Sequence, residues 1–516
     1  MGPTIAATVF GAIGVIAAFV MRPQFVDRAL AFRAALFWLL TTPVMFLLPT
    51  QIAILITCAM LALVFTPKGM DNRAAYYLAA LLAVPGSIEA PLPFPGLNYL
   101  FVLDAPKLAF FTILAPAFIF SPRPNAAKYA PLAGALFIIM TFAFSILDFR
   151  VTNLTSGLRA AFTTFLLFAL PFKALIRLIR TRSDVERIFG ILIFLALIFF
   201  FAALISQGTK WNFYSYATNR FGYSKFADFR YGFLRVSVTV NTVLAGYIMT
   251  LGLLSTEYYR ARRDFGFIRA WLMRGMCITA AFFTFSRGAW LGMIVGFGTY
   301  FLFARMPRAM RAPIVGFGLL VGLPLAFNLA ANGDLNSVDD FGSFEYRQEL
   351  LRTSIAYIQM HPLFGDPNFR ESGFFDHLIQ GQGIIDVVNS YINIALRYGL
   401  IGLTLFIGAY GSSIVALLKI GDLLPKTRRS DLELQRAVLL GANAGYLAVI
   451  FTTSSVSLIT HVGTVLIALS VAFVAAARAE HRASLTESAG QAGENGDRGR
   501  SARNRLAADA AGDLYG

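Results

Sequence analysis

The chain has 516 residues, of which 57% are hydrophobic and only 14% are charged. A soluble globular protein carries about 25% charged residues, so this composition excludes a chain of ordinary soluble domains. Lysine and arginine outnumber aspartate and glutamate by 44 to 28, for a net charge of +16. The basic residues gather in short connectors between apolar runs, as membrane topology and anionic lipid favour. We therefore expect the lipid bilayer as a partner of this charge, and no nucleic acid.

Apolar runs of membrane-spanning length recur from the first residues to about residue 477. Examples are the runs 191–205, 237–254, 312–331 and 400–418. A helix needs about 20 apolar residues to cross the hydrocarbon core, whereas a membrane β-barrel shows alternating strands of about 10 residues. The run 1–21 has no charged start or cleavage site of a signal peptide, so we interpret it as a first span. The sequence predicts an all-α, polytopic transmembrane bundle of roughly 12–15 spans.

Connectors rich in lysine and arginine alternate along the chain with connectors that are poor in them or mixed. The basic set is 22–33, 68–73, 123–128, 173–187, 260–274, 305–311 and 419–436, and the other set is 85–106, 148–157, 207–235, 286–288, 332–386 and 454–461. Because basic connectors face the cytoplasm, the second set is predicted to lie outside. The resulting organisation is a transmembrane region 1–331 with an outer loop 207–235, a large outer loop 332–386 with short helices, C-terminal transmembrane helices 387–478 and a disordered cytoplasmic tail 479–516.

The two large outer loops differ in charge. Loop 332–386 holds nine acidic residues and three arginines, and the apolar positions of 345–360 predict an amphipathic helix at the membrane surface. Loop 207–235 instead interleaves five basic residues with ten aromatic ones. Such a loop suits anionic groups and sugar faces, but aromatic rings also anchor proteins at membrane interfaces, and both interpretations stay open.

The most specific motif is Phe285-Ser-Arg-Gly-Ala-Trp-Leu-Gly292, between two predicted spans. Charges at a membrane boundary are costly and usually functional, and the planar fork of arginine matches phosphate oxygens. The simpler alternative for Arg287 is an arginine that extends from a helix end to water.

This octapeptide resembles the signature Ser-Arg-Gly-(Ala/Ser)-Trp-(Leu/Ile)-Gly of the O-antigen ligase and polysaccharide polymerase family of bacterial membrane proteins. Its matching members are Ser286, Arg287, Gly288, Trp290 and Gly292.

Three further stretches support the resemblance. They are Tyr346-Arg347 with His361-Pro-Leu-Phe-Gly365 and Asn368-Phe369, then Val388-Asn389-Ser390-Tyr391 with Gly399 and Gly402, and upstream Arg235 with Asn241 and Ala245. The second is similar to the family pattern His-Asn-x9-Gly-x-x-Gly, and the third lacks the glycine of the family's Arg-x-x-Gly segment.

Val388 departs from the family pattern, because the ligases carry a histidine there that is thought essential. Valine cannot transfer a proton. Family polymerases often lack this histidine and keep an acid just upstream, where Asp386 stands here. The resemblance therefore favours a polymerase over a ligase.

The resemblance implies a donor glycan linked through pyrophosphate to a polyprenyl lipid, attacked by an acceptor hydroxyl at the periplasmic face of the inner membrane. Arg235, Arg287 and Arg347 are the expected pyrophosphate ligands, because preorganised donors stabilise charge that develops on a leaving group. Asp386 is the first candidate for the general base, and His377 the next.

No Asp-x-Asp motif and no metal-ligand spacing occurs in the sequence, so we expect metal-independent chemistry without a cofactor. Three alternatives stay open. The chain could be a ligase that transfers glycan to lipid A-core, a transporter or flippase, or a structural membrane protein. A separate chain-length regulator is a further expected partner of a polymerase.

Overall fold

The computed structural model describes residues 2–95, 98–122, 129–151, 153–222, 229–317, 320, 343–379, 383, 385–423, 431–454 and 458–494. Several sequence predictions concern residues outside these ranges. They are the aromatic and basic stretch 223–228, most of the apolar run 312–331, the start of the acidic loop at 332–342 and the end of the tail at 495–516.

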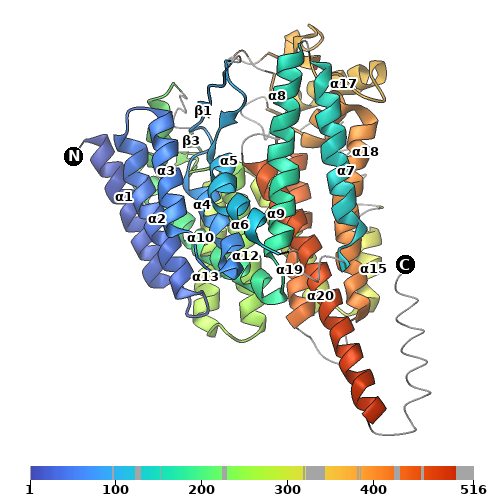
Figure 1. Ribbon diagram of the computed structural model, residues 1–516. Coiled ribbons are helices and arrows are strands. Elements are labelled where there is room, and N and C mark those ends of the chain that lie inside the picture. The colour runs from blue at the N-terminus through green and yellow to red at the C-terminus, as the bar shows by residue number, and fades with distance from the viewer. Residues whose placement is uncertain are drawn as a thin grey trace.

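The described chain is 78% helical with almost no strands, which confirms the all-α prediction (Figure 1). The α-helices are α1 Pro3–Met21, α2 Arg28–Leu47, α3 Gln51–Phe65, α4 Arg73–Ala83, α5 Ala105–Ala109, α6 Ala115–Phe120, α7 Leu132–Leu147, α8 Leu154–Thr164, α9 Leu170–Leu178, α10 Arg182–Thr209, α11 Phe213–Asn219, α12 Thr242–Ala261, α13 Phe267–Phe283, α14 Arg287–Arg305, α15 Arg308–Phe317, α17 Ser343–Met360, α18 Ser390–Lys419, α19 Asp431–Phe451 and α20 Ile459–Glu494.

Short elements interrupt or join these helices. Two are π-helices, η2 Phe110–Leu114 and η5 Phe165–Ala169, and the 3₁₀ turns are η1 Met70–Asn72, η4 Asp148–Arg150, η8 Phe369–Glu371, η9 Asp376–Leu378 and η10 Ile420–Leu423. The strands within the described residues form two antiparallel pairs, β1 Ala90–Pro91 with β2 Val102–Leu103 and β3 Phe229–Arg230 with β4 Phe233–Leu234.

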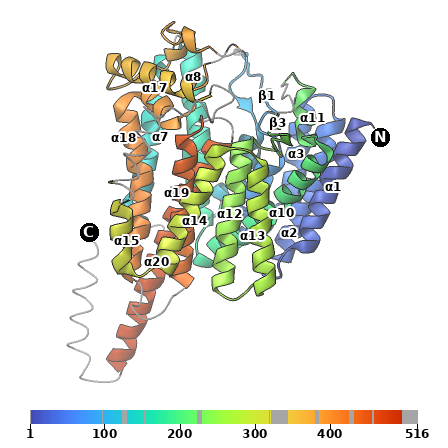
Figure 2. The same ribbon diagram turned by 180° about the vertical axis from the view of Figure 1, so that it is seen from behind.

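Eight helical segments of the described chain are long and apolar enough to cross a bilayer, and α3 and the segment 105–120 are shorter apolar helices. The chain is therefore a multi-pass membrane protein, while the number of 12–15 spans stays a prediction. The connection between α12 and α13 lies at one end of the bundle and α17 at the other (Figures 1 and 2). This arrangement agrees with the predicted alternation of basic and outer connectors.

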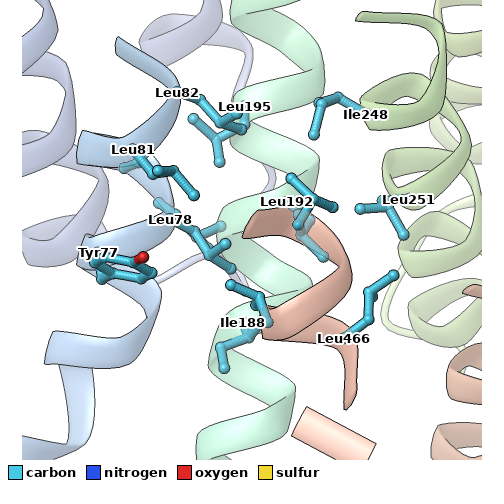
Figure 3. Close-up of a cluster of buried hydrophobic side chains, with 14 of the residues drawn as sticks. Tyr77, Leu78, Leu81, Leu82, Ile188, Leu192, Leu195, Ile248, Leu251 and Leu466 are labelled. Atoms are coloured by element: carbon cyan, nitrogen blue, oxygen red, sulfur yellow. The ribbon is translucent and has the colours of Figure 1, made fainter. Parts of the chain in front are cut away.

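Helix α10 is one of the longest spans and is largely buried within the bundle. Its Ile188, Leu192 and Leu195 pack between leucines of α4, side chains of α12 and Leu466 of α20 (Figure 3). Its window of highest hydropathy is 78% buried, so most of its apolar surface contacts protein. Helices such as α1, with 28% burial, leave more of their surface for lipid.

Helix α20 continues through the start of the predicted tail. The tail was expected to be disordered from residue 479, but the helix ends at Glu494. Alanine, glutamate and arginine favour helix, and Glu480 forms an ion pair of 2.5 Å with Arg182.

The predicted outer loop 207–235 is partly integrated into the bundle. Phe213 and Tyr214 are 0% and 2% exposed, and the Tyr214 hydroxyl accepts a hydrogen bond of 3.0 Å from Trp38 Nε1. Arg220 donates to the carbonyl oxygens of Phe46 and Leu48 at the end of α2. Phe213 and Tyr214 are therefore core residues and not interface anchors, because α11 folds back onto α2.

Candidate functional site

The motif 285–292 forms a tight turn between α13 and α14. Phe285 has a positive φ of 44°, and the Ser286 side chain accepts a hydrogen bond from the backbone N–H of Ala289 as the N-cap of α14. Trp290 stacks on Phe282 with ring centroids 5.5 Å apart, and its Nε1 donates to the carbonyl of Ala281 (3.0 Å). Ser286 and Trp290 therefore shape the turn and leave Arg287 exposed at its tip.

The motif glycines let α14 approach α19 at backbone distance. A Cβ at Gly292 would lie 3.1 Å from the Gly445 carbonyl, and a Cβ at Gly445 would lie 2.7 Å from the Gly292 carbonyl. A Cβ at Gly288 would overlap the Thr452 side chain. Small residues at such spacing allow close helix packing in membranes, so Gly288 and Gly292 have structural roles.

The segment that carries Arg235 docks on the same turn. The Val236 N–H donates to the Phe283 carbonyl (2.9 Å), and Phe233 stacks on Phe285 at 5.6 Å. The half-buried Arg235 thereby lies beside the turn that ends at Arg287. The structure thus places the segment that carries Arg235 against the turn that leads to Arg287.

The N-termini of α12, α14 and α18 lie close to the turn that carries Arg287. Helix α12 starts after its N-cap Asn241, and a Cβ at Gly288 of α14 would be 3.9 Å from Val243 in the first turn of α12. The start of α18 also lies nearby. Its Ser390 Oγ donates to the carbonyl of Thr453 (2.8 Å), and the adjacent Thr452 contacts Gly288 of α14. Each helix N-terminus carries about half a positive charge. Together with the arginines they form an electropositive surface suited to phosphate.

The large outer loop has its own small core, which positions Asp386. The Tyr346 hydroxyl donates to the Asp386 carbonyl (2.9 Å) and accepts from the Asp386 N–H (3.1 Å). Arg347, exposed in the first turns of α17, follows Tyr346 directly. Val388 packs partly buried against this core. The residue at the ligase histidine position is therefore a packing residue here.

The Asp386 side chain is half-buried, and its role as the general base stays a prediction. Asn389, three residues later, caps α18 by accepting from the N–H groups of Tyr391 (2.9 Å) and Ile392 (3.3 Å). Asp386 also acts on a nearby guanidinium: burial and Arg397 lower the pKa of Arg370, and Asp386 opposes this by raising it.

His377 lies elsewhere on the loop. Its Nε2 is 3.3 Å from the Thr353 hydroxyl and 3.7 Å from a Glu349 carboxylate oxygen, and its side chain is 50% exposed. These contacts hold His377, which belongs to η9, against the side of α17. No contact among the described residues joins His377 to Asp386. Its candidacy as base stays a prediction that the geometry does not favour.

The turn 361–366 attaches the loop to α18 through a break in that helix. Gly399 has φ 68° and ψ −171° inside α18, a conformation that is almost confined to glycine. The freed backbone groups bind the turn: Leu400 N–H donates to Pro362 O (2.8 Å), Ile401 N–H to Leu363 O (3.2 Å) and Asp366 N–H to Leu396 O (2.7 Å). The resemblance motifs around His361 and Gly399 are therefore two halves of one joint.

Sequence reasoning missed the charged residues that hold this joint. Arg150 donates to the carbonyl oxygens of Phe364 (2.7 Å), Gly365 (3.0 Å) and Arg397 (3.2 Å). Arg397 in turn binds the fully buried Asp148 through Nε (3.0 Å) and Nη2 (2.7 Å).

Tyr398 and Thr164 complete the environment of that carboxylate, at 3.1 and 2.8 Å. The signal for this network was an arginine inside an apolar span, which is costly unless paired. Gly402, one turn after the break, leaves room for the ring of Phe144 at 3.4 Å from a Cβ placed there.

Within the described ranges, no group of three or more His, Cys, Asp or Glu side chains is placed to hold a metal ion. Metal-independent chemistry stays a prediction.

The family model described as O-antigen ligase matches residues 274–407, from within α13 to within α18. This segment contains Arg287, the loop with Asp386, and Gly399. No curated protein matches the chain. Residues 274–407 are therefore similar to the O-antigen ligase family, in agreement with the resemblance of the sequence motifs.

Proposed function

We propose that the protein is a polymerase that joins polyprenyl-pyrophosphate-linked oligosaccharide repeats into a surface polysaccharide, O-antigen or exopolysaccharide. Catalysis takes place at the periplasmic face of the bacterial inner membrane. The family match supports glycan transfer in O-antigen assembly. The observation that favours a polymerase over a ligase is the valine packed at position 388, with Asp386 held beside it.

The donor pyrophosphate binds at the converging N-termini of α12, α14 and α18, with Arg235 and Arg287 as ligands and Arg347 reaching in from α17. The acceptor hydroxyl attacks the anomeric carbon of the donor. The bond from that carbon to the pyrophosphate oxygen breaks as the new glycosidic bond forms, and the hydroxyl proton passes to Asp386. The lipid pyrophosphate leaves with its negative charge stabilised by the arginines.

The first test is genetic. Deletion of the gene of a polymerase leaves surface glycan that carries single repeats, whereas deletion of a ligase leaves long glycan on the carrier lipid. Because the matching family model is described as O-antigen ligase, the second phenotype is the specific alternative. Carrier-linked polymer in the deletion strain contradicts the proposal.

The second test is a pair of arginine variants at the two ends of α14. Removal of a donor that stabilises transition-state charge costs about 10²–10³ in rate, so Arg287→Ala is expected to reduce polymer formation from purified lipid-linked repeats by this factor. Arg305→Ala, at the other end of the same helix, is the matched control and is expected to stay near the wild-type rate. Equal rates for both variants contradict the assignment of Arg287.

A further inference from the structure

A cavity of about 510 Å³ opens beside α18, on the side lined by α8 and η5. Side chains of α19 and the first turn of α20 complete its wall. Small-molecule sites occupy about 300–1,000 Å³, so the cavity is large enough for a ligand. Neither the family match nor the sequence motifs assign a role to it.

The lining changes from polar to apolar along the helices. Ser156 and Arg159 line it near the start of α8, whereas Leu167 and Phe168 line it in η5, about 18 Å further along at 1.5 Å per residue. On α18, Asn393 near the outer end contrasts with Phe406, about three and a half turns deeper. The cavity therefore offers polar groups near the outer face and apolar groups at membrane depth.

The polar end carries positive charge. Arg159 donates through Nε and Nη2 to the Tyr99 carbonyl (3.2 and 2.9 Å) and lies over the Tyr99 ring at 3.7 Å. In the part of the chain that the structure describes, no carboxylate lies within ion-pair distance of Arg159. Arg370 lies next to this end, with its Nη2 3.5 Å from Oδ1 of the cavity residue Asn393, and Asp386 acts on its charge. The charge of Arg397, also in the wall, is balanced by Asp148. An anionic group complements this end.

The wall of the cavity also contains an irregular helical turn. Leu167 and Phe168 belong to the π-helix η5. Short π-helical turns inside α-helices are frequent at functional sites.

The chemistry of polymerisation calls for two anionic lipid heads. The acceptor repeat carries its pyrophosphate at one end of a saccharide and its reacting hydroxyl at the other. Its lipid end must therefore bind apart from the donor pyrophosphate. Ser390 lies between the two regions, because it lines the cavity and also donates to Thr453, whose neighbour Thr452 contacts Gly288.

We propose that this cavity binds the pyrophosphate head and the first isoprene units of the acceptor, a second polyprenyl-linked glycan. The head lies at Arg159 and Asn393, and the isoprene units lie against Leu167, Phe168 and Phe406. This inference rests on the proposed polymerase function, and it separates the acceptor site from the donor site at Arg287.

The test counts lipids on the full-length protein by native mass spectrometry, with undecaprenyl pyrophosphate as the probe. Wild-type protein is expected to bind two molecules. Ala160→Trp, which fills the cavity, and Arg159→Leu, which removes its cation, are each expected to bind one. Leu158→Trp is the matched control, because this neighbouring side chain is 49% exposed, and it is expected to bind two. Arg159→Leu keeps the test valid if Ala160→Trp does not fold.

Two bound lipids on both cavity variants overturn the proposal. Displacement of the second probe molecule by equimolar phosphatidylglycerol also overturns it, because the cavity then holds bulk phospholipid. Displacement of the second probe molecule by an equimolar amount of inorganic pyrophosphate also overturns the proposal, because the isoprenoid tail then contributes nothing to binding. A wild-type protein that binds two lipids but forms no polymer contradicts the proposed function and not the second lipid site. In a polymerising preparation with preformed lipid-linked polymer as donor and single lipid-linked repeats as acceptor, Arg159→Leu is expected to raise the KM for the single repeat at least tenfold while the KM for the polymer stays unchanged.

Discussion

Replacement of Gly399 by alanine tests the view that the joint between the outer loop and α18 positions the catalytic groups. A Cβ at residue 399 would overlap the Leu363 carbonyl oxygen and lie 2.5 Å from the Phe364 nitrogen. These are backbone atoms, so a side-chain rotation cannot relieve the overlap. Alanine in this conformation costs about 1–3 kcal/mol, and the turn 361–366 must move away from the helix.

Release of the turn loses three backbone hydrogen bonds between it and α18. At about 1 kcal/mol each, these bonds favour the attached loop by about 3 kcal/mol. The strain of about 1–3 kcal/mol in Gly399→Ala opposes them and shifts the equilibrium about 5- to 150-fold toward the detached loop. Because the loop carries Arg347 and Asp386, the rate of polymer formation is expected to fall as the fraction of protein with an attached loop falls.

The assay is hydrogen–deuterium exchange of the peptide that contains residues 396–402, together with limited proteolysis of the loop 343–386. Gly399→Ala is expected to accelerate both. Gly408→Ala, in the same helix with nothing within 4 Å of the added Cβ, is the control and is expected to leave both unchanged or slower. If exchange and proteolysis in Gly399→Ala match those in Gly408→Ala, the joint does not depend on the glycine and the reasoning is refuted.

Three further predictions concern the core, the helix packing and the base. Asp148→Leu leaves the half-buried Arg397 guanidinium without its partner and is expected to destabilise the protein by less than the about 3–5 kcal/mol of a fully buried pair, seen as a lower melting temperature; an unchanged melting temperature would show that the pair contributes nothing. Gly292→Leu is expected to separate α14 from α19 and lower the yield of folded protein, whereas Gly298→Leu, with open space around its Cβ, is expected to fold normally; equal yields would argue against the close packing. Asp386→Asn is expected to lower kcat by about 10²–10⁴, while His377→Ala retains most activity; the reverse order in a polymerisation assay would identify His377 as the base.

Much of the architecture followed from local sequence. The apolar runs and the alternation of basic connectors predicted a polytopic helical bundle, because a chain in lipid must satisfy its own backbone groups. The apolar spacing in 345–360 predicted a helix that α17 confirms. Arg287 was expected at the boundary of two spans, and it lies exposed at the start of α14. In each case the information lies within about 20 neighbouring residues.

Other features depended on contacts between distant segments. Phe213 and Tyr214 were indistinguishable from interface aromatics until α11 was seen packed on α2, 172–176 residues away in sequence. Helix α20 extends to Glu494, and its Glu480 pairs with Arg182, 298 residues away in sequence, a contact that composition does not show.

The sequence by itself determined the membrane setting, the family resemblance and the candidate residues Arg235, Arg287 and Asp386. Only the tertiary structure decided what the motifs do. Within the motif, Arg287 is exposed, whereas Ser286 and Trp290 shape the turn and Gly288 allows the contact with α19. The tertiary structure also joined the His361 turn to Gly399 and paired Arg397 with Asp148 across 249 residues. The physical reason is that a periodic pattern specifies which face of a helix is apolar, but the partner of a buried charge or a backbone group is specified only when the helices pack.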